Sequence, residues 1–423
     1  MQKFFYPARL QGVVHAVPSK SEAHRRLICA GLTNGTRTIV CSDTAEDISA
    51  TIACLKALGA SVQREGDSLL IRGGGHPLDR IPRLECKESG STLRFFVPIA
   101  MALTGGGIFV MRGRLSQRPM DIYRDLFVPR GAEWHMAIGV DGAAELHVSG
   151  RLEPGSYVLP GDVSSQFISG LLFALPLLQG DSSLSVKGPV ESGAYIRMTL
   201  QALRDSGIQL EETGPWQWTI PGNQSYNALS CPVEGDWTQA AVLLCAGALG
   251  GEVGITGLNP DSIQGDREIV PLLQRLGAEI VWEGDTLWAR GGNLRGTEAD
   301  IRECPDLGPL IALVCQVAEG RSRITGVRRL RLKESDRLAA TLDMLNGLGG
   351  QAVLKGGETI DLTGVSRLRG GPADTHRDHR MVMLASLAAL VSEGPVRANG
   401  VEALSKSWPG YLETYEALGG RAE

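Results

Sequence analysis

The sequence has little of what marks nucleic-acid-binding, membrane-spanning or disulfide-rich proteins. Lysine and arginine number 42 against 47 aspartates and glutamates, a net charge of −5, so the basic excess of a nucleic-acid binder is missing. No run approaches the roughly 20 apolar residues that cross a bilayer. The first 20 residues lack the basic flank and apolar run of a signal peptide. The eight cysteines form no Cys-x-x-Cys pair, so we interpret them as core thiols and expect a reducing cytoplasm.

Common cofactor and catalytic motifs are also missing. We find no Walker loop, no Gly-x-Gly-x-x-Gly, no Gly-x-Ser-x-Gly and no His-Glu-x-x-His. The seven histidines do not recur at the spacing of metal ligands. We therefore expect an enzyme that uses neither a cofactor nor a metal.

Glycine, in contrast, is abundant, with 54 residues. A helix-stop pattern, in which a glycine precedes a strand-like run, recurs about every 72 residues, and such a period indicates a repeated structural unit. A left-handed residue, usually glycine, commonly ends a helix. The glycines of this pattern are Gly59, Gly131, Gly207, Gly277, Gly349 and Gly419.

A second signal repeats at the same period and predicts six units of an α/β protein. Each unit has a polar start, a helix that is apolar nearly all round and is therefore buried, a β-branched run and an outer helix. The expected order is strand, buried helix, strand, outer helix, strand, strand. The polar starts are Ser19, Ser89, Ser164, Asp236, Asp306 and Asp378.

The last unit stops after its outer helix, which leaves its sheet incomplete. Residues 4–17 precede the first buried helix and are free to complete that sheet. We therefore expect a discontinuous domain of residues 1–19 and 235–423 and an inserted domain of residues 20–234, with three units each. The active site is expected in the cleft between them.

Two features of these units favour anion binding. The N-terminus of a helix offers unpaired N–H groups and a partial positive charge, and cations stand near several polar starts. The densest charge cluster is residues 328–337, where Arg329, Lys333 and Arg337 are spaced four apart and would share one face of a helix. Glu334 would sit among these cations, a setting that keeps a carboxylate ionised as a base.

These motifs resemble the enolpyruvyl transferase family along nearly the whole chain, from Lys20 to about Pro409. The sequence departs from the family pattern at Trp237 and Thr238, which stand where relatives usually carry small residues. The matching motifs are Ser19-Lys20-Ser21 with Arg25, Ser89-Gly90-Ser91-Thr92-Leu93-Arg94, Arg118-Pro119, Ser164-Ser165-Gln166, Ser192 with Tyr195, Pro305-Asp306, Lys333-Glu334 with Asp336-Arg337, Asp378-His379-Arg380 and Lys406 before Pro409.

The resemblance implies a two-domain inside-out α/β barrel, with three βαβαββ units per domain, that binds two small anions and no nucleic acid or membrane. It implies that shikimate 3-phosphate is bound by Lys20, Ser21, Arg25, Ser164, Ser165, Gln166, Ser192, Tyr195, Asp306 and Lys333. It assigns phosphoenolpyruvate to Lys20, Gly90, Arg118, Gln166, Arg337, Arg380 and Lys406. Charge-assisted bonds from arginine suit a ligand that carries both a carboxylate and a phosphate.

The reaction implied by the resemblance is addition followed by elimination, a step of the shikimate pathway toward chorismate and the aromatic amino acids. The 5-hydroxyl of shikimate 3-phosphate attacks phosphoenolpyruvate, and the tetrahedral intermediate then loses phosphate. Asp306 is the candidate acid–base group for the hydroxyl and Glu334 for the methyl proton. Lys20 and Lys406 would stabilise the developing charge. We expect a monomer and a target of glyphosate.

Three other readings remain at this point. The enolpyruvyl transferase that acts on UDP-N-acetylglucosamine shares the six-unit fold, but it normally carries a cysteine in a loop of the first domain, and residues 103–120 contain none. An RNA-phosphate cyclase would need nucleotide chemistry for which no motif is present. A non-enzymatic anion-binding repeat protein is the fourth reading.

The division of the cations between the expected domains predicts that ligand closes the protein. Lys20, Arg25 and Arg118 belong to one domain and Arg337 and Arg380 to the other, and their repulsion is only partly screened within a Debye length of about 8 Å. We expect the radius of gyration from small-angle scattering to fall when shikimate 3-phosphate is added, and again with glyphosate. A radius that stays constant across the three samples would contradict closure.

Overall fold

The computed structural model describes residues 1–42, 44–74 and 81–423 and divides the chain into two compact units. Unit 1 is Met1–Ser19 with Glu234–Glu423, and unit 2 is Lys20–Val233. The sequence placed the second boundary one residue later, after residue 234. Each unit has a hydrophobic core of its own.

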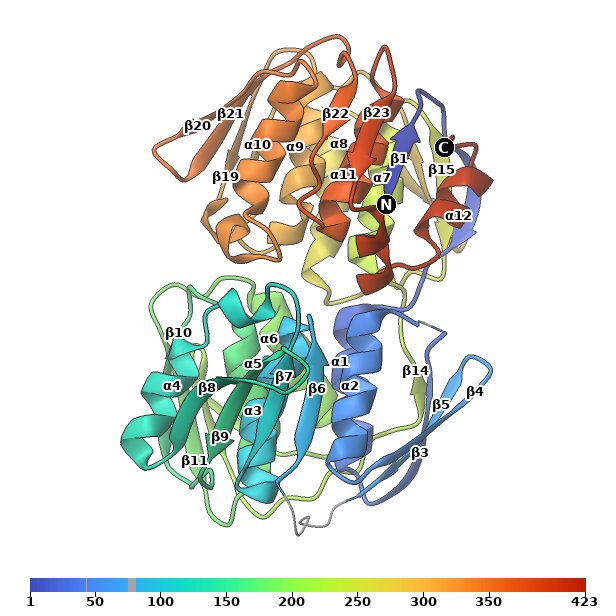
Figure 1. Ribbon diagram of the computed structural model, residues 1–423. Helices are drawn as coiled ribbons and strands as arrows, with labels where there is room; N and C mark the ends of the chain where they lie inside the picture. Colours follow the sequence, from blue (N-terminus) through green and yellow to red (C-terminus); the bar gives the residue numbers. More distant parts are fainter. Residues whose placement is uncertain (43, 75–80) are drawn as a thin grey trace. The chain divides into compact units, whose positions relative to one another are not determined.

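Unit 2 follows the order strand, helix, strand, helix, strand, strand (Figure 1). This order runs twice in full between Arg83 and Ile220, whereas the first repeat begins directly with its helix at Lys20 and receives its first strand from Cys231–Pro232 at the end of the unit. Its buried helices are α1 (Lys20–Leu32), α3 (Gly90–Thr104) and α5 (Ser165–Ala174), and its outer helices are α2 (Glu46–Ala57), α4 (Asp121–Phe127) and α6 (Gly193–Arg204). Its strands are β3 (Gly35–Val40), β4 (Ser61–Glu65), β5 (Ser68–Gly73), β6 (Arg83–Lys87), β7 (Gly106–Met111), β8 (Glu133–Ile138), β9 (Ala144–Ser149), β10 (Ser156–Pro160), β11 (Ser182–Lys187), β12 (Glu211–Gly214), β13 (Gln217–Ile220) and β14 (Cys231–Pro232).

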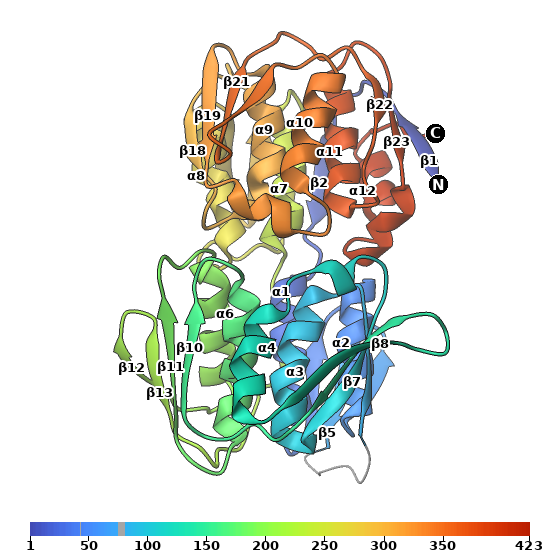
Figure 2. The same ribbon diagram turned by 60° about the vertical axis from the view of Figure 1, so that its left-hand side comes forward.

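Unit 1 follows the same order (Figure 2), except that its first repeat takes its first strand from the N-terminal segment and its last repeat ends after the outer helix. Its buried helices are α7 (Trp237–Ala248), α9 (Gly308–Val317) and α11 (His379–Leu390), and its outer helices are α8 (Ile269–Leu276), α10 (Arg337–Gly347) and α12 (Tyr411–Ala417). Its strands are β1 (Gln2–Phe5), β2 (Gln11–His15), β15 (Glu252–Thr256), β16 (Glu279–Glu283), β17 (Thr286–Arg290), β18 (Glu298–Asp300), β19 (Arg321–Thr325), β20 (Ala352–Lys355), β21 (Thr359–Thr363), β22 (Gly371–Ala373) and β23 (Val396–Asn399).

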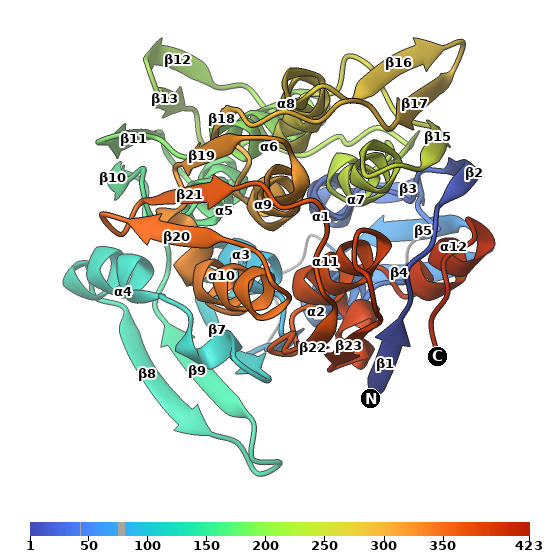
Figure 3. The same ribbon diagram turned by 90° about the horizontal axis from the view of Figure 1, so that it is seen from above.

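The buried helices explain why the architecture is inside out. Every residue of α7 and of α11 is buried, and burying each large apolar side chain stabilises the fold by about 1.5–3 kcal/mol. The sheets form the outside, as the view of unit 1 along its helices shows (Figure 3). The predicted inside-out α/β fold with three units per domain is confirmed.

The sheets follow one plan. In unit 2 their strand orders are β14-β3-β5-β4, β6-β7-β9-β8 and β10-β11-β13-β12. In unit 1 they are β16-β17-β15-β2, β18-β19-β21-β20 and β1-β23-β22. The first two strands of each sheet of unit 2 are parallel, and its other pairs are antiparallel.

The N-terminal segment takes part in two sheets of unit 1. Strand β1 pairs with β23 in the sixth sheet, the one that lacked strands. Strand β2 pairs with β15 in the fourth sheet, so the expectation that all of residues 4–17 would complete the sixth sheet was wrong for this part. The cause is the crossing of the chain: β14, which precedes α7, pairs with β3 of unit 2, and β2 takes its place.

The two chain crossings lie next to each other in unit 1. The Ser19 amide donates to the Glu234 carbonyl over 2.7 Å, and Pro18 and Gly235 form an antiparallel bridge. The side chain of Gln264 holds both strands, because its oxygen accepts from the Ser19 hydroxyl at 3.0 Å and its nitrogen donates to the Gly235 carbonyl at 2.8 Å. The chain therefore leaves unit 1 and returns to it at neighbouring residues. No helix of the described residues is long and apolar enough to cross a membrane.

The six predicted stop glycines all have left-handed backbones, with φ between 74° and 97°. At Gly131 a Cβ atom would meet nothing within 4 Å, and the same holds for Gly347, which is helical. We therefore expect opposite effects of alanine. Gly131→Ala should lower the free energy of unfolding by about 1 kcal/mol because of the left-handed backbone, and Gly347→Ala should raise it by about 0.5–1 kcal/mol. The urea-unfolding midpoint should therefore fall in the first variant and rise in the second. Equal shifts in both variants would contradict the conformational argument.

Candidate active-site clusters

The first cluster, in unit 1, is built around the guanidinium of Arg337, whose side chain is 2% exposed. It lies 2.8 Å from Asp306, 2.7 Å from Glu334 and 2.8 Å from Asp378. Asp378 also accepts from the Ser335 hydroxyl and from the backbone N–H of Arg380, which caps α11. Four of the predicted site and motif residues, Asp306, Glu334, Arg337 and Asp378, are therefore joined in one ionic network.

Asp306 is the centre of charge in this network. Its Oδ1 lies 2.9 Å from the Lys333 ammonium and 2.8 Å from Arg337. Burial raises the pKa of Asp306, but Lys333, Arg337 and Arg380 together outweigh burial and hold the pKa well below its usual range. Burial in turn lowers the pKa of Lys333, which Asp306 partly restores. Asp306 is thus an ionised carboxylate bound to a lysine that loses its proton more readily than usual.

The backbone that carries these residues differs from the predicted helix. Residues 328–332 form the 3₁₀ turn η6 (Arg328–Leu332), Lys333 is extended, and α10 begins only at Arg337. The prediction that Arg329, Lys333 and Arg337 share one helical face was wrong, yet Lys333 and Arg337 still converge on Asp306. Asp306 itself lies in the turn η5 (Pro305–Leu307), two residues before α9, so its carboxylate is free of the capping role that Asp236 and Asp378 perform.

A residue of the first turn of α7 contacts Arg380, a cation on α11. Arg380, 7% exposed, donates to the Gln239 side chain at 3.3 Å. The amide of Gln239 donates to the Ser407 carbonyl at 3.3 Å, next to Lys406. Gln239 was not predicted from the sequence, because its contact with Arg380 exists only in the folded protein, where α7 and α11 pack together.

The second cluster, in unit 2, is centred on Arg25, which is 3% exposed. Its guanidinium donates to the Thr199 hydroxyl at 2.9 Å and to the carbonyls of Tyr195 and Ser21. Ser192, which begins α6, has a left-handed backbone with φ 57°, a conformation that costs energy in a residue other than glycine and is often kept at functional positions. Ser21, Arg25, Ser192 and Tyr195 therefore lie together in unit 2.

The starts of α3 and α5 form a third group. The Ser164 hydroxyl caps α5 by accepting from the Gln166 N–H, and Ser165 begins that helix. The Gln166 side chain accepts from Arg94 at 2.6 Å and donates to Ser91 at 2.8 Å. The guanidinium of Arg118 packs so closely on Gly90 that a Cβ there would overlap it. Arg94 orients Gln166, a contact that the motif alone did not reveal.

Lys20 completes the set of unit 2. Its ammonium lies 2.8 Å from Asp47 on α2, a partner that the sequence did not single out because Asp47 belongs to a different repeat element. Burial lowers the pKa of neighbouring His24 to about 3, so this histidine is neutral. Among the described residues, no group of three or more His, Cys, Asp and Glu side chains is arranged to hold a metal.

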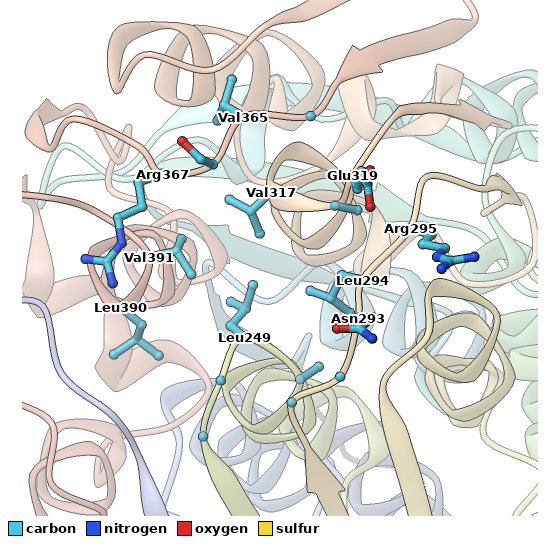
Figure 4. Close-up of a pocket in the computed structure, with 18 of the residues that line it drawn as sticks. Leu249, Asn293, Leu294, Arg295, Val317, Glu319, Val365, Arg367, Leu390 and Val391 are labelled. Carbon is cyan, nitrogen blue, oxygen red and sulfur yellow. The ribbon is translucent and has the colours of Figure 1, made fainter.

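A cavity of about 1220 Å³ in unit 1 (Figure 4) is lined by none of these residues. Leu249, Val317 and Leu390 line it at the ends of α7, α9 and α11. Helix C-termini carry a partial negative charge, whereas the side chains that line the cavity include both arginines and glutamates. The N-terminal ends of the same helices, where Asp306, Gln239 and Arg380 lie, are the better candidates for an anion site.

Comparisons with known proteins agree on one family. Residues 6–415 match the family model described as EPSP synthase (3-phosphoshikimate 1-carboxyvinyltransferase). The chain is 38% identical to the 3-phosphoshikimate 1-carboxyvinyltransferase of Clostridium kluyveri, over 99% of this chain and 97% of that protein. It is 40% identical to the enzyme of that name from Clostridium botulinum, over 98% and 96%.

Solved structures show the same fold at lower identity. EPSP synthase from Acinetobacter baumannii superposes with a TM-score of 0.81 at 23% identity and covers 100% of this chain and 99% of that one. The enolpyruvyl transferase NikO from Streptomyces tendae superposes with a TM-score of 0.75 at 18% identity, over 100% and 98%.

Removing the guanidinium of Arg337 should take the ion-pair partner from Glu334 and Asp378 and leave Asp306 paired with Lys333 alone. We expect Arg337→Gln to lower the free energy of unfolding at pH 8 by about 3 kcal/mol or more. Although burial acts to raise it, Arg337 lowers the pKa of Asp378 to about 2; without Arg337, burial raises that pKa above its unfolded value. Protonation of Asp378 at low pH then removes its unpaired charge from the variant. The loss of unfolding free energy relative to the parent should therefore be smaller at pH 5 than at pH 8.

The matched control is Arg331→Gln, because Arg331 pairs with Asp336 on the surface at 3.4 Å with both side chains 41% exposed. An exposed pair contributes at most about 1 kcal/mol. Thermal or urea unfolding at pH 5 and pH 8 measures the stability of both variants relative to the parent. If Arg337→Gln loses the same free energy of unfolding at both pH values, this account is wrong.

Proposed function

Because the chain belongs to the EPSP synthase (3-phosphoshikimate 1-carboxyvinyltransferase) family, we propose that it transfers the enolpyruvyl group of phosphoenolpyruvate to the 5-hydroxyl of shikimate 3-phosphate and releases phosphate. The observation that carries this proposal is the network of Asp306, Lys333, Glu334 and Arg337. It combines two carboxylates with cations at hydrogen-bond distance, which addition and elimination of protons both require.

The assignment of residues follows the same logic. Asp306 takes the proton of the attacking hydroxyl in the addition and gives it to the departing phosphate in the elimination, while the Lys333 ammonium at 2.9 Å compensates the charge of the carboxylate. Glu334 acts on the methylene carbon, which gains a proton in the addition and loses one in the elimination. Lys20 and Lys406 stabilise charge on the phosphate and carboxylate, together with Arg118 and Arg380.

Binding of shikimate 3-phosphate is assigned to the hydroxyls and cations of unit 2. Ser21, Arg25, Ser164, Ser165, Gln166, Ser192 and Tyr195 gather at the starts of α1, α5 and α6. N–H groups at such helix starts favour phosphate. Phosphoenolpyruvate is assigned to Lys20, Gly90, Arg118, Gln166, Arg337, Arg380 and Lys406. One chain supplies every assigned group, which supports a monomer, and the charged, water-soluble reactants support a cytoplasmic location.

The enolpyruvyl transferase that acts on UDP-N-acetylglucosamine is the weaker reading. Residues 103–120, which connect α3 to the loop of Arg118, contain no cysteine. The family model and the curated relatives named above also carry the shikimate name, not the UDP-sugar name.

The purified protein should release inorganic phosphate from phosphoenolpyruvate only when shikimate 3-phosphate is present, and treatment with a chelator should leave the rate unchanged. Glu334→Gln should lower kcat by at least about a hundredfold with the KM of shikimate 3-phosphate within a few-fold, since an acid–base group acts on the transition state. A phosphate-release assay measures all of these rates.

The control variant is Arg25→Ala, which should mainly raise the KM of shikimate 3-phosphate. Phosphate release that depends on UDP-N-acetylglucosamine in place of shikimate 3-phosphate would overturn the proposed function. Identical kinetic profiles of the two variants would show that catalysis and binding are wrongly assigned.

A further inference from the structure

A carboxylate outside the proposed mechanism lies beside its machinery. Asp266, in the turn η4 (Gly265–Glu268), is 1% exposed. Its Oδ2 accepts a hydrogen bond from the Thr238 hydroxyl at 2.5 Å.

Two consecutive residues of α7 hold an acid and a cation next to each other. Thr238 binds Asp266, while Gln239 binds Arg380. Arg380 is assigned to phosphoenolpyruvate, whose anionic groups would occupy the same cation. Arg380 also acts on Asp266 electrostatically, because it lowers the pKa of this carboxylate. A bound substrate anion and ionised Asp266 would therefore both draw on the positive charge of Arg380.

Asp266 faces charged groups from several elements. Asp236, the cap of α7, and Asp306 of η5 are acidic neighbours, Arg380 of α11 is the cationic one, and Cys304 precedes η5. Lys333, Arg337 and Glu334 face Asp306. Burial and Asp306 raise the pKa of Asp266 to about 6, against the opposing effects of Thr238 and Arg380.

We propose that Asp266 is a positioning residue for phosphoenolpyruvate: when ionised it competes with the substrate anion for Arg380, and when protonated it leaves Arg380 to the substrate. This inference rests on the proposed function and adds a pH-dependent control of the same site. Substrate binding then takes up one proton, which moves from solvent to the Asp266 carboxylate.

The sign of the effect follows from the charge. Above about pH 6 Asp266 is ionised, and Asp266→Asn removes the competing charge. Below that pH parent and variant both carry a neutral group. The ratio of the parent KM to the Asp266→Asn KM for phosphoenolpyruvate should therefore be near 1 at pH 5.5 and rise to about fivefold at pH 8, at the lower end of typical coupling between sites.

The Thr238 hydroxyl stabilises ionised Asp266, so Thr238→Val should raise the pKa of Asp266. In Thr238→Val, competition between ionised Asp266 and phosphoenolpyruvate for Arg380 should therefore begin at a higher pH than in the parent. Asp343→Asn is the matched control, because it makes the same change of charge on the exposed face of α10, and it should follow the parent at every pH.

Steady-state kinetics with saturating shikimate 3-phosphate from pH 5.5 to 8.5 tests the proposal. The phosphate of phosphoenolpyruvate titrates in this range too, but its effect is the same for all variants and cancels in the ratios. The KM should change while kcat stays within about twofold, because a positioning residue acts on binding. An Asp266→Asn ratio that does not vary with pH would overturn the proposal.

Unfolding gives a readout without substrate. The raised pKa means that protonated Asp266 stabilises the fold below about pH 4, and that this contribution is lost as the pH rises through about 6. The Tm of Asp266→Asn minus that of the parent should increase from pH 4 to pH 7, and the Asp343→Asn difference should stay flat. A flat difference for Asp266→Asn would also count against the proposal.

Two kinds of failure remain distinguishable. A parent protein that releases no phosphate contradicts the proposed function, whereas an active parent with a constant ratio contradicts only the role of Asp266. If Asp266→Asn does not fold, Thr238→Val decides: a pH profile identical to that of the parent overturns the role, and a profile moved to higher pH supports it.

Discussion

The guanidinium of Arg337 is the interaction on which the acid–base cluster depends. A charge this deeply buried is tolerated only when it is paired, and Arg337 is paired with carboxylates from three places in the chain. Arg337 begins α10, Asp378 caps α11, and Asp306 stands just before α9. One cation thus links the starts of three helices, and the carboxylates that we propose as catalytic are held by the same contacts that hold the fold.

The two units meet the same helical architecture with different chemistry. At the helix starts of unit 2 the side chains are hydroxyls, an amide and arginines, as at Ser164, Gln166 and Arg25, which suit binding of anions through donors. At the helix starts of unit 1 they are carboxylates among cations, as at Asp306 and Asp378, which suit transfer of protons. The six repeats therefore share one backbone arrangement, whereas the side chains at their helix starts differ between the two units.

Much of the fold could be predicted from the sequence because its signals are local. The stop glycines recur because only glycine takes φ near +90° without strain, and an all-apolar helix such as α11 has to be buried. The pairing of β2 with β15 could not be predicted, since strand pairing across the chain leaves no local pattern. Lys333 and Arg337 were correctly grouped, but the extended backbone at Lys333 was missed because spacing alone assumes a continuous helix.

The site was predictable only where its residues stand in motifs. Ser21, Arg25 and Asp306 belong to recognisable runs, whereas Asp266, Gln239 and Asp47 lie in unremarkable stretches and gain their importance from the neighbours that folding brings to them. Asp266 is the clearest case, because its raised pKa comes from burial and from Asp306, forty residues later in the chain. A carboxylate whose properties come from such distant neighbours cannot be identified from its own sequence context.

The adjacency of the two crossings at Ser19 and Glu234 has a consequence for the ancestry of the protein. An uninterrupted stretch that enters and leaves its host at neighbouring residues is arranged like a gene fragment inserted into a loop, and excising it would leave ends only one hydrogen bond apart. Because β14 and β2 have exchanged sheets across that point, each half now carries a strand from the other's repeat.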